Sequence, residues 1–259
     1  MLTIFNKELM NPPKELHSQA SLGSSNKPKF PEEIIKDFLA SNPANAFSIG
    51  FGSSACFAYA PPENRYSNYQ RMFCGVDEIY CIFLGGLNNL NSLLRQYGLS
   101  KGNNEAMFII EAYRTLRDRG PYPADQVLKD LEGSYGFVVY DSKAKSVFAA
   151  LGSDERVKLH WGVAAGGSVV VSDNLKLIKE SCAKSFAPFP AVCCSWCMFH
   201  SEQGLMSFEH PRSKMKAMPR IDSEGVMCGA DFKADVQSRI CTMPRVGSEA
   251  NWALRGFQA

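Results

Sequence analysis

The sequence predicts an α+β protein built from antiparallel sheets, and two observations lead to this fold class. Four β-rich segments follow one another closely between Ser134 and Ser172, and the segments that separate them have the length of hairpin loops. The helical patterns stand in a block before them, without the regular β–α alternation of a doubly wound parallel sheet. With 259 residues and 45% hydrophobic content, the chain can bury a substantial core.

The first sixty or so residues predict one helix between strands. Leu2–Phe5 is short, apolar and β-prone. A helix begins at Pro31, because the fixed φ angle of proline suits the first helical position. Its buried face is formed by Ile34, Ile35, Phe38 and Leu39. Ala46–Phe51 and Ala55–Ala60 then predict two strands, which a Gly-Ser-Ser segment joins as a hairpin.

The central stretch predicts a strand, a glycine turn and a helix, preceded by a polar loop over Ser67–Arg71. Ile79–Leu84 is an uninterrupted apolar run, typical of a strand that is buried on both faces. The Gly85-Gly86 pair ends this strand, the Asn88-Asn89 pair supplies a helix cap, and Gly98 closes the helix. Such a turn can direct backbone N–H groups at an anion or a developing oxyanion, or it can be only a tight, well-packed corner.

A second helix follows and ends at Gly120-Pro121. Its apolar face is formed by Ile109, Ala112, Tyr113 and Leu116. Arg117 and Arg119 lie in its last turn, where basic residues complement the helix dipole. We therefore expect a structural role for both arginines.

The rest of the chain predicts strands with short helices. Asp125 caps a short helix that stops at Gly133, and another helix covers Asp173–Glu180, with Ser172-Asp173 as its cap. The four β-rich segments between these helices predict one antiparallel meander: Ser134–Tyr140, Ser146–Leu151, Val157–Val163 and Ser168–Ser172. The proline-containing tail predicts edge strands at Ala217–Ile221 and Val226–Phe232.

The composition excludes several classes of function. The 28 basic and 26 acidic residues are evenly spread and give a net charge of +2, so we expect no nucleic-acid partner. No apolar run approaches the roughly eighteen residues of a membrane span, and the first residues lack a signal-peptide pattern. Nine cysteines, an odd number, suit reduced thiols in the cytoplasm, with the nucleus as an alternative, better than a disulfide scaffold.

Two cysteines and three histidines are candidate site residues. Cys194 and Cys197 have redox-motif spacing and His200 follows, but two prolines just upstream predict a turn into an edge strand. A thioredoxin-like site needs a helix N-terminus instead, and a metal site needs a fourth ligand, so we expect no metal and no cofactor. We interpret His160 as a satisfied core or rim residue and His210 as part of a surface turn.

The segment from Leu131 onward resembles the glutaminase domain of class II glutamine amidotransferases such as asparagine synthetase. The resemblance rests on Leu131 with Gly133, on Tyr135–Phe137 and Tyr140-Asp141, on Lys158–His160 with Gly162, and on Ser172-Asp173 with Lys176-Leu177. These pieces occur in the order found in that domain. The match covers about residues 1–190.

A closer resemblance covers the whole chain. Tyr97-Gly98-Leu99 and Leu116–Arg119 are the YGL and LRDR motifs of the plant aluminium-induced proteins, which are related to the stem-specific proteins. Gly204–Pro211 and Met218–Arg220 are also similar to that group. This resemblance implies the four-layer αββα fold of N-terminal-nucleophile hydrolases. It also implies one domain over residues 1–259, with a core of about residues 1–190 and a C-terminal extension wrapped on it, in a family linked to aluminium and stress responses.

The resemblance implies that the catalytic nucleophile is missing. In a working class II amidotransferase, removal of the initiator methionine exposes a cysteine whose thiolate attacks the glutamine amide, with its own amino group as the base. Here Leu2 follows Met1, and leucine has no nucleophilic atom. A large second residue also disfavours removal of Met1. Thr3 carries the nearest hydroxyl, but it gains a free amino group only if two residues are removed.

The resemblance implies two further losses at the glycine turn. The family's oxyanion hole uses an Asn-Gly pair, which corresponds here to Leu84-Gly85, so one donor is lost, typically at a cost of about 10²–10³ in rate. The carboxylate that follows this pair in the family is replaced by Gly86, so the substrate ammonium loses a partner. Arg65 is the nearest candidate for the family's substrate-binding arginine, and Glu105 takes the place of an aspartate.

Together these losses predict a catalytically silent protein that retains a pocket for a small-molecule or protein partner. The candidate pocket residues are Leu84, Gly85, Gly86, Asn88, Glu105, Ser172 and Asp173. Two alternatives stay open: an active amidohydrolase whose nucleophile is Thr3 or a cysteine, and a structural interaction module in which Leu84 and other side chains fill the pocket. A homodimer is a candidate assembly for this protein.

Overall fold

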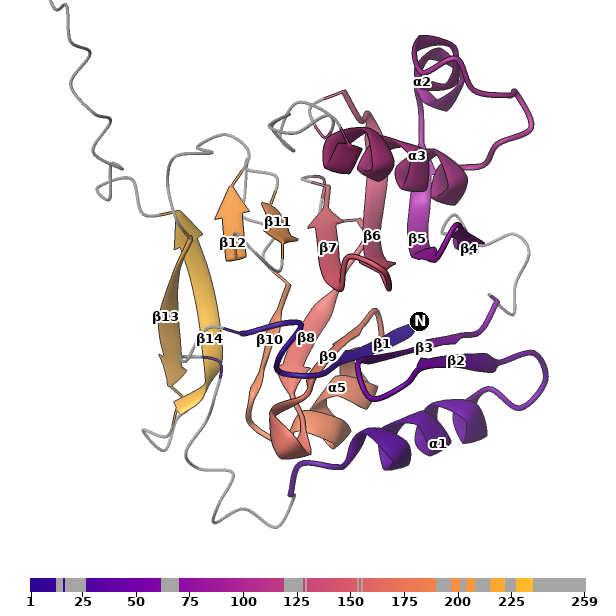
Figure 1. Cartoon of the computed structure of the whole chain (residues 1–259). Helices are drawn as coiled ribbons and strands as arrows, with labels where there is room; N and C mark the ends of the chain where they lie inside the picture. Colours follow the sequence, from indigo (N-terminus) through magenta and orange to yellow (C-terminus); the bar gives the residue numbers. More distant parts are fainter. Residues whose placement is uncertain are drawn as a thin grey trace, which may run out of the picture.

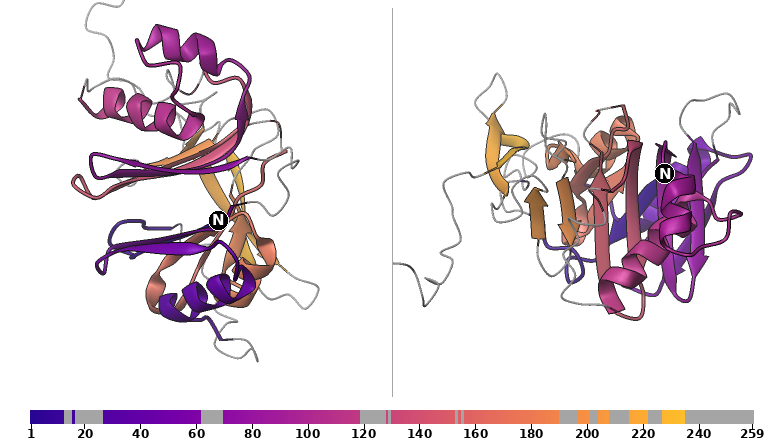
Figure 2. Two further views of the ribbon diagram at one scale, coloured as in Figure 1. Left: turned by 90° about the vertical axis from the view of Figure 1, so that its right-hand side faces the viewer. Right: turned by 90° about the horizontal axis from the view of Figure 1, so that it is seen from above.

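Two six-stranded sheets lie face to face and form the centre of the molecule (Figures 1 and 2). The computed structural model describes residues 1–12, 16, 27–61, 70–118, 128, 130–152, 154, 156–189, 197–200, 204–207, 215–221 and 227–234. All structural statements below concern these residues.

The first sheet has the strand order β10-β8-β9-β1-β3-β2. Its strands are β1 (Leu2–Phe5), β2 (Phe47–Phe51), β3 (Ala55–Tyr59), β8 (His160–Val163), β9 (Val169–Ser172) and β10 (Phe186–Pro188). The N-terminal strand β1 is interior, because it pairs antiparallel with β3 on one side and with β9 on the other. The beginning of the chain is therefore fixed in the middle of a sheet. The predicted strand at residues 2–5 and the predicted hairpin of β2 and β3 are confirmed.

The second sheet has the strand order β12-β11-β7-β6-β5-β4. Its strands are β4 (Arg71–Val76), β5 (Ile79–Leu87), β6 (Gly133–Asp141), β7 (Ser146–Leu151), β11 (Cys197–His200) and β12 (Gly204–Ser207). A separate two-stranded sheet consists of β13 (Met215–Ile221) and β14 (Met227–Ala234). The two tail segments predicted as edge strands are thus strands, but they pair with each other rather than with a large sheet.

Helices cover the outer faces of both large sheets. Helices α1 (Pro31–Ser41) and α5 (Leu175–Cys182) pack on the first sheet, and α2 (Leu90–Gln96) and α3 (Glu105–Asp118) pack on the second (Figure 2). A third apolar cluster lies between the sheets and includes Trp161, Tyr140 and Phe57. The result is a four-layer αββα arrangement with antiparallel sheets, so the predicted fold class is confirmed.

The predicted meander is wrong. β6 pairs with β7 in the second sheet and β8 pairs with β9 in the first, so the four segments form two hairpins in two different sheets. The chain passes from one sheet to the other between Leu151 and His160. A segment of this length is compatible with either a hairpin or a crossing between sheets, and only the packing of the two apolar faces decides.

Two predictions about the central strands are also corrected. Strand β4 was not predicted, and its first residue, Arg71, had been assigned to a polar loop. Strand β5 does not end at the glycines, because Gly85 and Gly86 still pair with Tyr135 and Ser134 of β6. The glycines therefore shape a strand rather than terminate it.

Helix α2 ends in a Schellman closure that contains the YGL motif. Gly98 adopts a φ of +67°, which is the left-handed region where glycine avoids a steric penalty. The N–H of Leu99 donates to the carbonyl of Leu94 at 2.8 Å. The ring of Tyr97 packs edge-on against Phe108 of α3, with ring centroids 5.2 Å apart. This motif therefore fixes a helix end against its neighbouring helix, as the sequence indicated for Tyr97 and Leu99.

Helix α5 is capped by a different residue from the one predicted. The side chain of Asn174 accepts hydrogen bonds from the backbone N–H groups of Lys176 and Leu177. Ser172 and Asp173 are consequently free of the capping role and bind the chain's first residue instead, as described next. The predicted short helix after Asp125 lies mostly outside the described residues.

Candidate functional site

The candidate site is built around the N-terminus, which lies between the two sheets (Figure 2). The α-ammonium nitrogen of Met1 is 2.6 Å from Oδ1 of Asp173, and the other carboxylate oxygen of Asp173 is 2.8 Å from a guanidinium nitrogen of Arg71. The hydroxyl of Ser172 donates to the backbone carbonyl of Met1 at 2.6 Å. Both ends of the Met1 backbone are thus bound by two consecutive residues at the end of β9.

The first side chains alternate between two cores, as strand geometry requires. Met1 and Phe5 belong to the cluster between the sheets, whereas Leu2 and Ile4 belong to the cluster under α1 and α5. Leu2 is fully buried, and Met1 is 1% exposed. Thr3 is buried as well, and its hydroxyl has no hydrogen-bond partner within the described structure. None of these side chains reaches solvent.

Burial lowers the pKa of the Met1 α-amino group below its ordinary value of 8.0. The Asp173 carboxylate opposes this effect by stabilising the charged form, and the charge of Arg71 adds to the lowering. Because desolvation dominates, the fold encloses this ammonium at a cost that the carboxylate offsets only in part. Removal of Asp173 would leave two cationic groups together without a counter-charge.

The backbone N–H group of Gly85 is already paired within the fold. The N–H of Gly85 donates to the carbonyl of Gln70 at 2.8 Å, so it is not directed at an open site. Gly85 has a φ of +91°, and a Cβ atom there would lie 1.9 Å from the carbonyl oxygen of Ser134. Leu84 is 4% exposed and packs between the sheets. This corner is filled by the protein's own groups.

The candidate pocket residues fall into two groups. Leu84 pairs with Arg71 in the ladder of β4 and β5, and Arg71 connects to Asp173 and, through it, to the N-terminus and Ser172. In the second group, a Cβ atom added to Gly86 would meet a carboxylate oxygen of Glu105 at 4.0 Å. Asn88 is exposed and uses its N–H on the carbonyl of Glu132.

Arg71 was missed by the sequence interpretation. It precedes Asp173 by about a hundred positions, and it stands in a segment that reads as polar loop. Its register opposite Leu84 places it beside the N-terminus, which no local pattern reveals. Arg65, the candidate from the sequence, lies outside the described residues.

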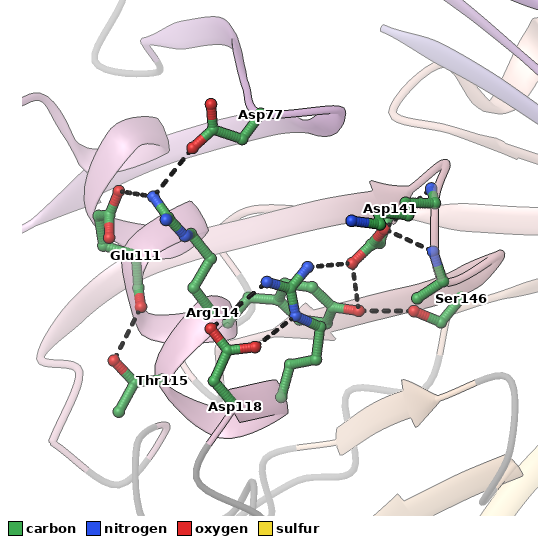
Figure 3. Close-up of polar contacts among 11 residues, drawn as sticks. Asp77, Glu111, Arg114, Thr115, Asp118, Asp141 and Ser146 are labelled. Carbon is green, nitrogen blue, oxygen red and sulfur yellow. Dashed lines mark hydrogen bonds and ion pairs between the residues drawn. The ribbon is translucent and has the colours of Figure 1, made fainter.

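Arg117 and Asp118 of the LRDR motif belong to a polar cluster between the end of helix α3 and Asp141 of strand β6 (Figure 3). Arg117 binds the exposed Asp118 and the fully buried Asp141, with nitrogen–oxygen distances of 2.8 Å to each. Tyr113 contacts the hydroxyl of Ser146 at 2.5 Å and donates to Asp141 at 3.4 Å. The hydrogen bond from Arg117 to Asp118 raises the pKa of Arg117 most, and the bond to Asp141 raises it further. The structural role predicted for Arg117 agrees with this geometry, and Arg119 lies outside the described residues.

His160 lies at the start of β8 opposite Ser172, and its Nδ1 is buried without a hydrogen-bond partner in the described structure. The prediction of a satisfied histidine is therefore wrong for this nitrogen. Burial lowers the pKa of His160 below its ordinary value of 6.5, and the nearby Lys158 adds to this shift. Asp173 opposes the shift and Lys179 supports it.

The lowered pKa of His160 makes stability dependent on pH. As the pH falls through about 6.5, His160 becomes protonated in the unfolded chain but stays neutral in the folded chain. Protonation therefore favours the unfolded state and lowers the free energy of unfolding at acid pH. We expect a His160→Gln variant to lose less stability than the parent protein between about pH 7.5 and about pH 5.5. Urea midpoints at the two pH values measure the effect. An equal decrease in both proteins would contradict it.

The described thiols are poorly suited to nucleophilic catalysis. Cys56, Cys74, Cys81 and Cys182 are free, and burial raises the pKa of each thiol, which disfavours the reactive thiolate. Cys194 and His210 lie outside the described residues, and nothing is described of the side chains of Cys197 and His200. Within the described ranges, no three His, Cys, Asp or Glu side chains gather as metal ligands would.

A sequence profile of the family described as aluminium-induced protein matches residues 2–234. The stem-specific protein TSJT1 of Nicotiana tabacum is 38% identical over 151 residues, which cover 58% of this chain and 99% of that protein. These two matches confirm the resemblance drawn from the YGL and LRDR motifs.

Two further comparisons concern amidotransferases. A protein described as a probable asparagine synthetase (glutamine-hydrolyzing) of Dictyostelium discoideum is 41% identical over 66 residues, which cover 26% of this chain and 12% of that protein. The structure of glutamine phosphoribosylpyrophosphate amidotransferase from B. subtilis matches with a TM-score of 0.47 and 14% identity, over 80% of this chain and 48% of that one. The chain thus spans only a part of either amidotransferase. Among its described helices, none has the length and apolar character needed to cross a membrane.

Proposed function

Because the chain belongs to the aluminium-induced protein family, we propose that it is a catalytically silent form of the glutamine amidotransferase fold that acts by binding a partner. The observation that carries the proposal is the state of the N-terminus. With Met1 in place, the nitrogen of Leu2 is a peptide amide within β1 and cannot serve as a base. The α-ammonium group of Met1 is paired with the carboxylate of Asp173 at 2.6 Å.

The surroundings of Gly85 in strand β5 support the same proposal. In the class II mechanism an oxyanion needs two preorganised donors, and one of them is replaced here by the buried side chain of Leu84. The other, the N–H of Gly85, is bonded to Gln70. A substrate would have to break this bond before it could be stabilised.

The partner that we propose is a small molecule with an amino group. The part of the candidate pocket that remains accessible is the corner of Gly86, Asn88 and Glu105, where Gly86 and Glu105 are half-buried. A carboxylate at such a corner favours a cationic or hydroxylated ligand. Met1 and Leu84 are buried between the sheets and fill the inner part, so the ligand would bind at the rim of the former site.

A glutaminase assay combined with the intact mass tests the silence. We expect no ammonia release from glutamine above the rate without protein, and a mass that retains Met1. Ammonia release at an enzymatic rate would overturn the proposal, and loss of Met1-Leu2 with activity would favour Thr3 as the nucleophile. A thermal-shift screen of amine-bearing metabolites, with Glu105→Gln as the control variant, tests the ligand class. Equal shifts in both proteins would exclude Glu105 as its partner.

A further inference from the structure

The α-amino group of Met1 is enclosed more completely than an ordinary chain terminus. Met1 is 1% exposed, and the side chain of its partner Asp173 is 13% exposed. The carbonyl of the same residue accepts a bond from Ser172, so both polar ends of Met1 are paired. A terminus of this kind is a component of the core rather than a free end.

An attached group would disturb this arrangement in two ways. Acetylation or a preceding residue turns the ammonium into a neutral amide, so Asp173 would keep only Arg71, whose side chain is 31% exposed. The added atoms would also need the space where the Asp173 carboxylate lies, 2.6 Å from the nitrogen. Because the next residue, Leu2, pairs with Ser172 and Ala58, a displacement would reach both neighbours of β1.

We propose that a free α-amino group on Met1 is a structural requirement of this fold, and that any group attached to this nitrogen loosens the pairing of β1 with β9. The requirement is separate from catalytic silence, since an active protein could have it too. Modification of this nitrogen would therefore lower the stability of the folded protein.

The test compares two forms of the full chain. One is released from a cleavable fusion so that it begins with Met1, and the other carries a Gly-Ser extension before Met1. We expect the extension to lower the melting temperature by about 6 °C or more, the size expected for breaking a buried ion pair in a domain of this length. In an Asp173→Asn background the same extension should lower it by less than half as much, because the ion pair is already absent.

Asp37→Asn serves as the matched control. Asp37 also binds a cationic nitrogen, that of Lys29, at 2.6 Å, but both side chains are substantially exposed. The effect of the extension should be fully additive with this variant. An extension that leaves the melting temperature unchanged within about 1 °C, or that acts equally in the Asp173→Asn background, would overturn the proposal.

A second measurement does not depend on whether the extended form folds. The protein that begins with Met1 is treated briefly with an acylating reagent, and the labelled amines are identified by mass spectrometry. We expect the Met1 amine to react much more slowly than in the urea-unfolded chain, while the exposed Lys176 reacts equally fast in both. Equal reactivity of Met1 in the folded and unfolded chains would overturn the proposal.

Discussion

A Gly85→Ala variant is expected to be severely destabilised, by about 3–5 kcal/mol, or to fail to fold. The added methyl group would lie 1.9 Å from the carbonyl oxygen of Ser134, which belongs to the backbone of the neighbouring strand and cannot rotate away. The φ of +91° adds a conformational penalty for any residue with a side chain. Overpacking and backbone strain of this kind together cost about the stated amount. Urea unfolding followed by circular dichroism measures it.

Gly50→Ala is the matched control for this prediction. Gly50 also lies in a strand, β2, but nothing stands within 4 Å of the position of its Cβ atom. We expect this variant to differ from the parent protein by about 0.5 kcal/mol or less. Similar unfolding midpoints for the two alanine variants would contradict the close approach of β5 and β6 at Gly85.

An Asp141→Asn variant is expected to lose about 2–3 kcal/mol of stability. Asp141 is fully buried, and one of its oxygens accepts bonds from Arg117 and Tyr113. Its other oxygen accepts from the N–H groups of Lys143 and Ala144, which an asparagine can still satisfy. The change therefore removes the charge that faces Arg117 and replaces the acceptor of this arginine with an NH2 donor. The loss lies at the low end for a broken buried pair, because the guanidinium is about one-third exposed.

Asp118→Asn controls for the general effect of removing a carboxylate from Arg117. Asp118 binds the same guanidinium at the same distance of 2.8 Å, but it lies on the surface. We expect no measurable change in its unfolding midpoint, because water replaces the lost contact. Equal losses in the two variants would show that burial does not distinguish the two carboxylates.

The local elements of the fold could be predicted from the sequence, whereas the assignment of strands to sheets could not. Leu2–Phe5, the hairpin of β2 and β3, and the first residues of α1 follow from periodicity and turn residues. Strand β4 was missed because its apolar run, Met72–Cys74, is only three residues long before Gly75 interrupts it, which is shorter than the runs that identify a strand. The crossing from β7 to β8 depends on which apolar faces meet, which is a property of the whole chain.

The candidate site was predicted in part for a related reason. Leu84, Gly85 and Asp173 were identified through the family resemblance, and the structure places all three near Arg71 or the N-terminus. Arg71 itself could not be found, because its role arises from strand register rather than from a motif. The YGL and LRDR segments, which led to the family resemblance, take part in a helix closure and a buried ion pair.

The position of β1 has a consequence for how the protein is made. Asp173 follows Met1 by 172 residues, and β9, which completes the sheet beside β1, ends just before it. At translation rates of about 5–20 residues per second, the first strand emerges from the ribosome on the order of ten to thirty seconds before this partner exists. The backbone groups of β1 that pair with β9 have no partner strand during that interval. Chaperones that protect nascent chains should therefore raise the yield of correctly folded protein in a cell.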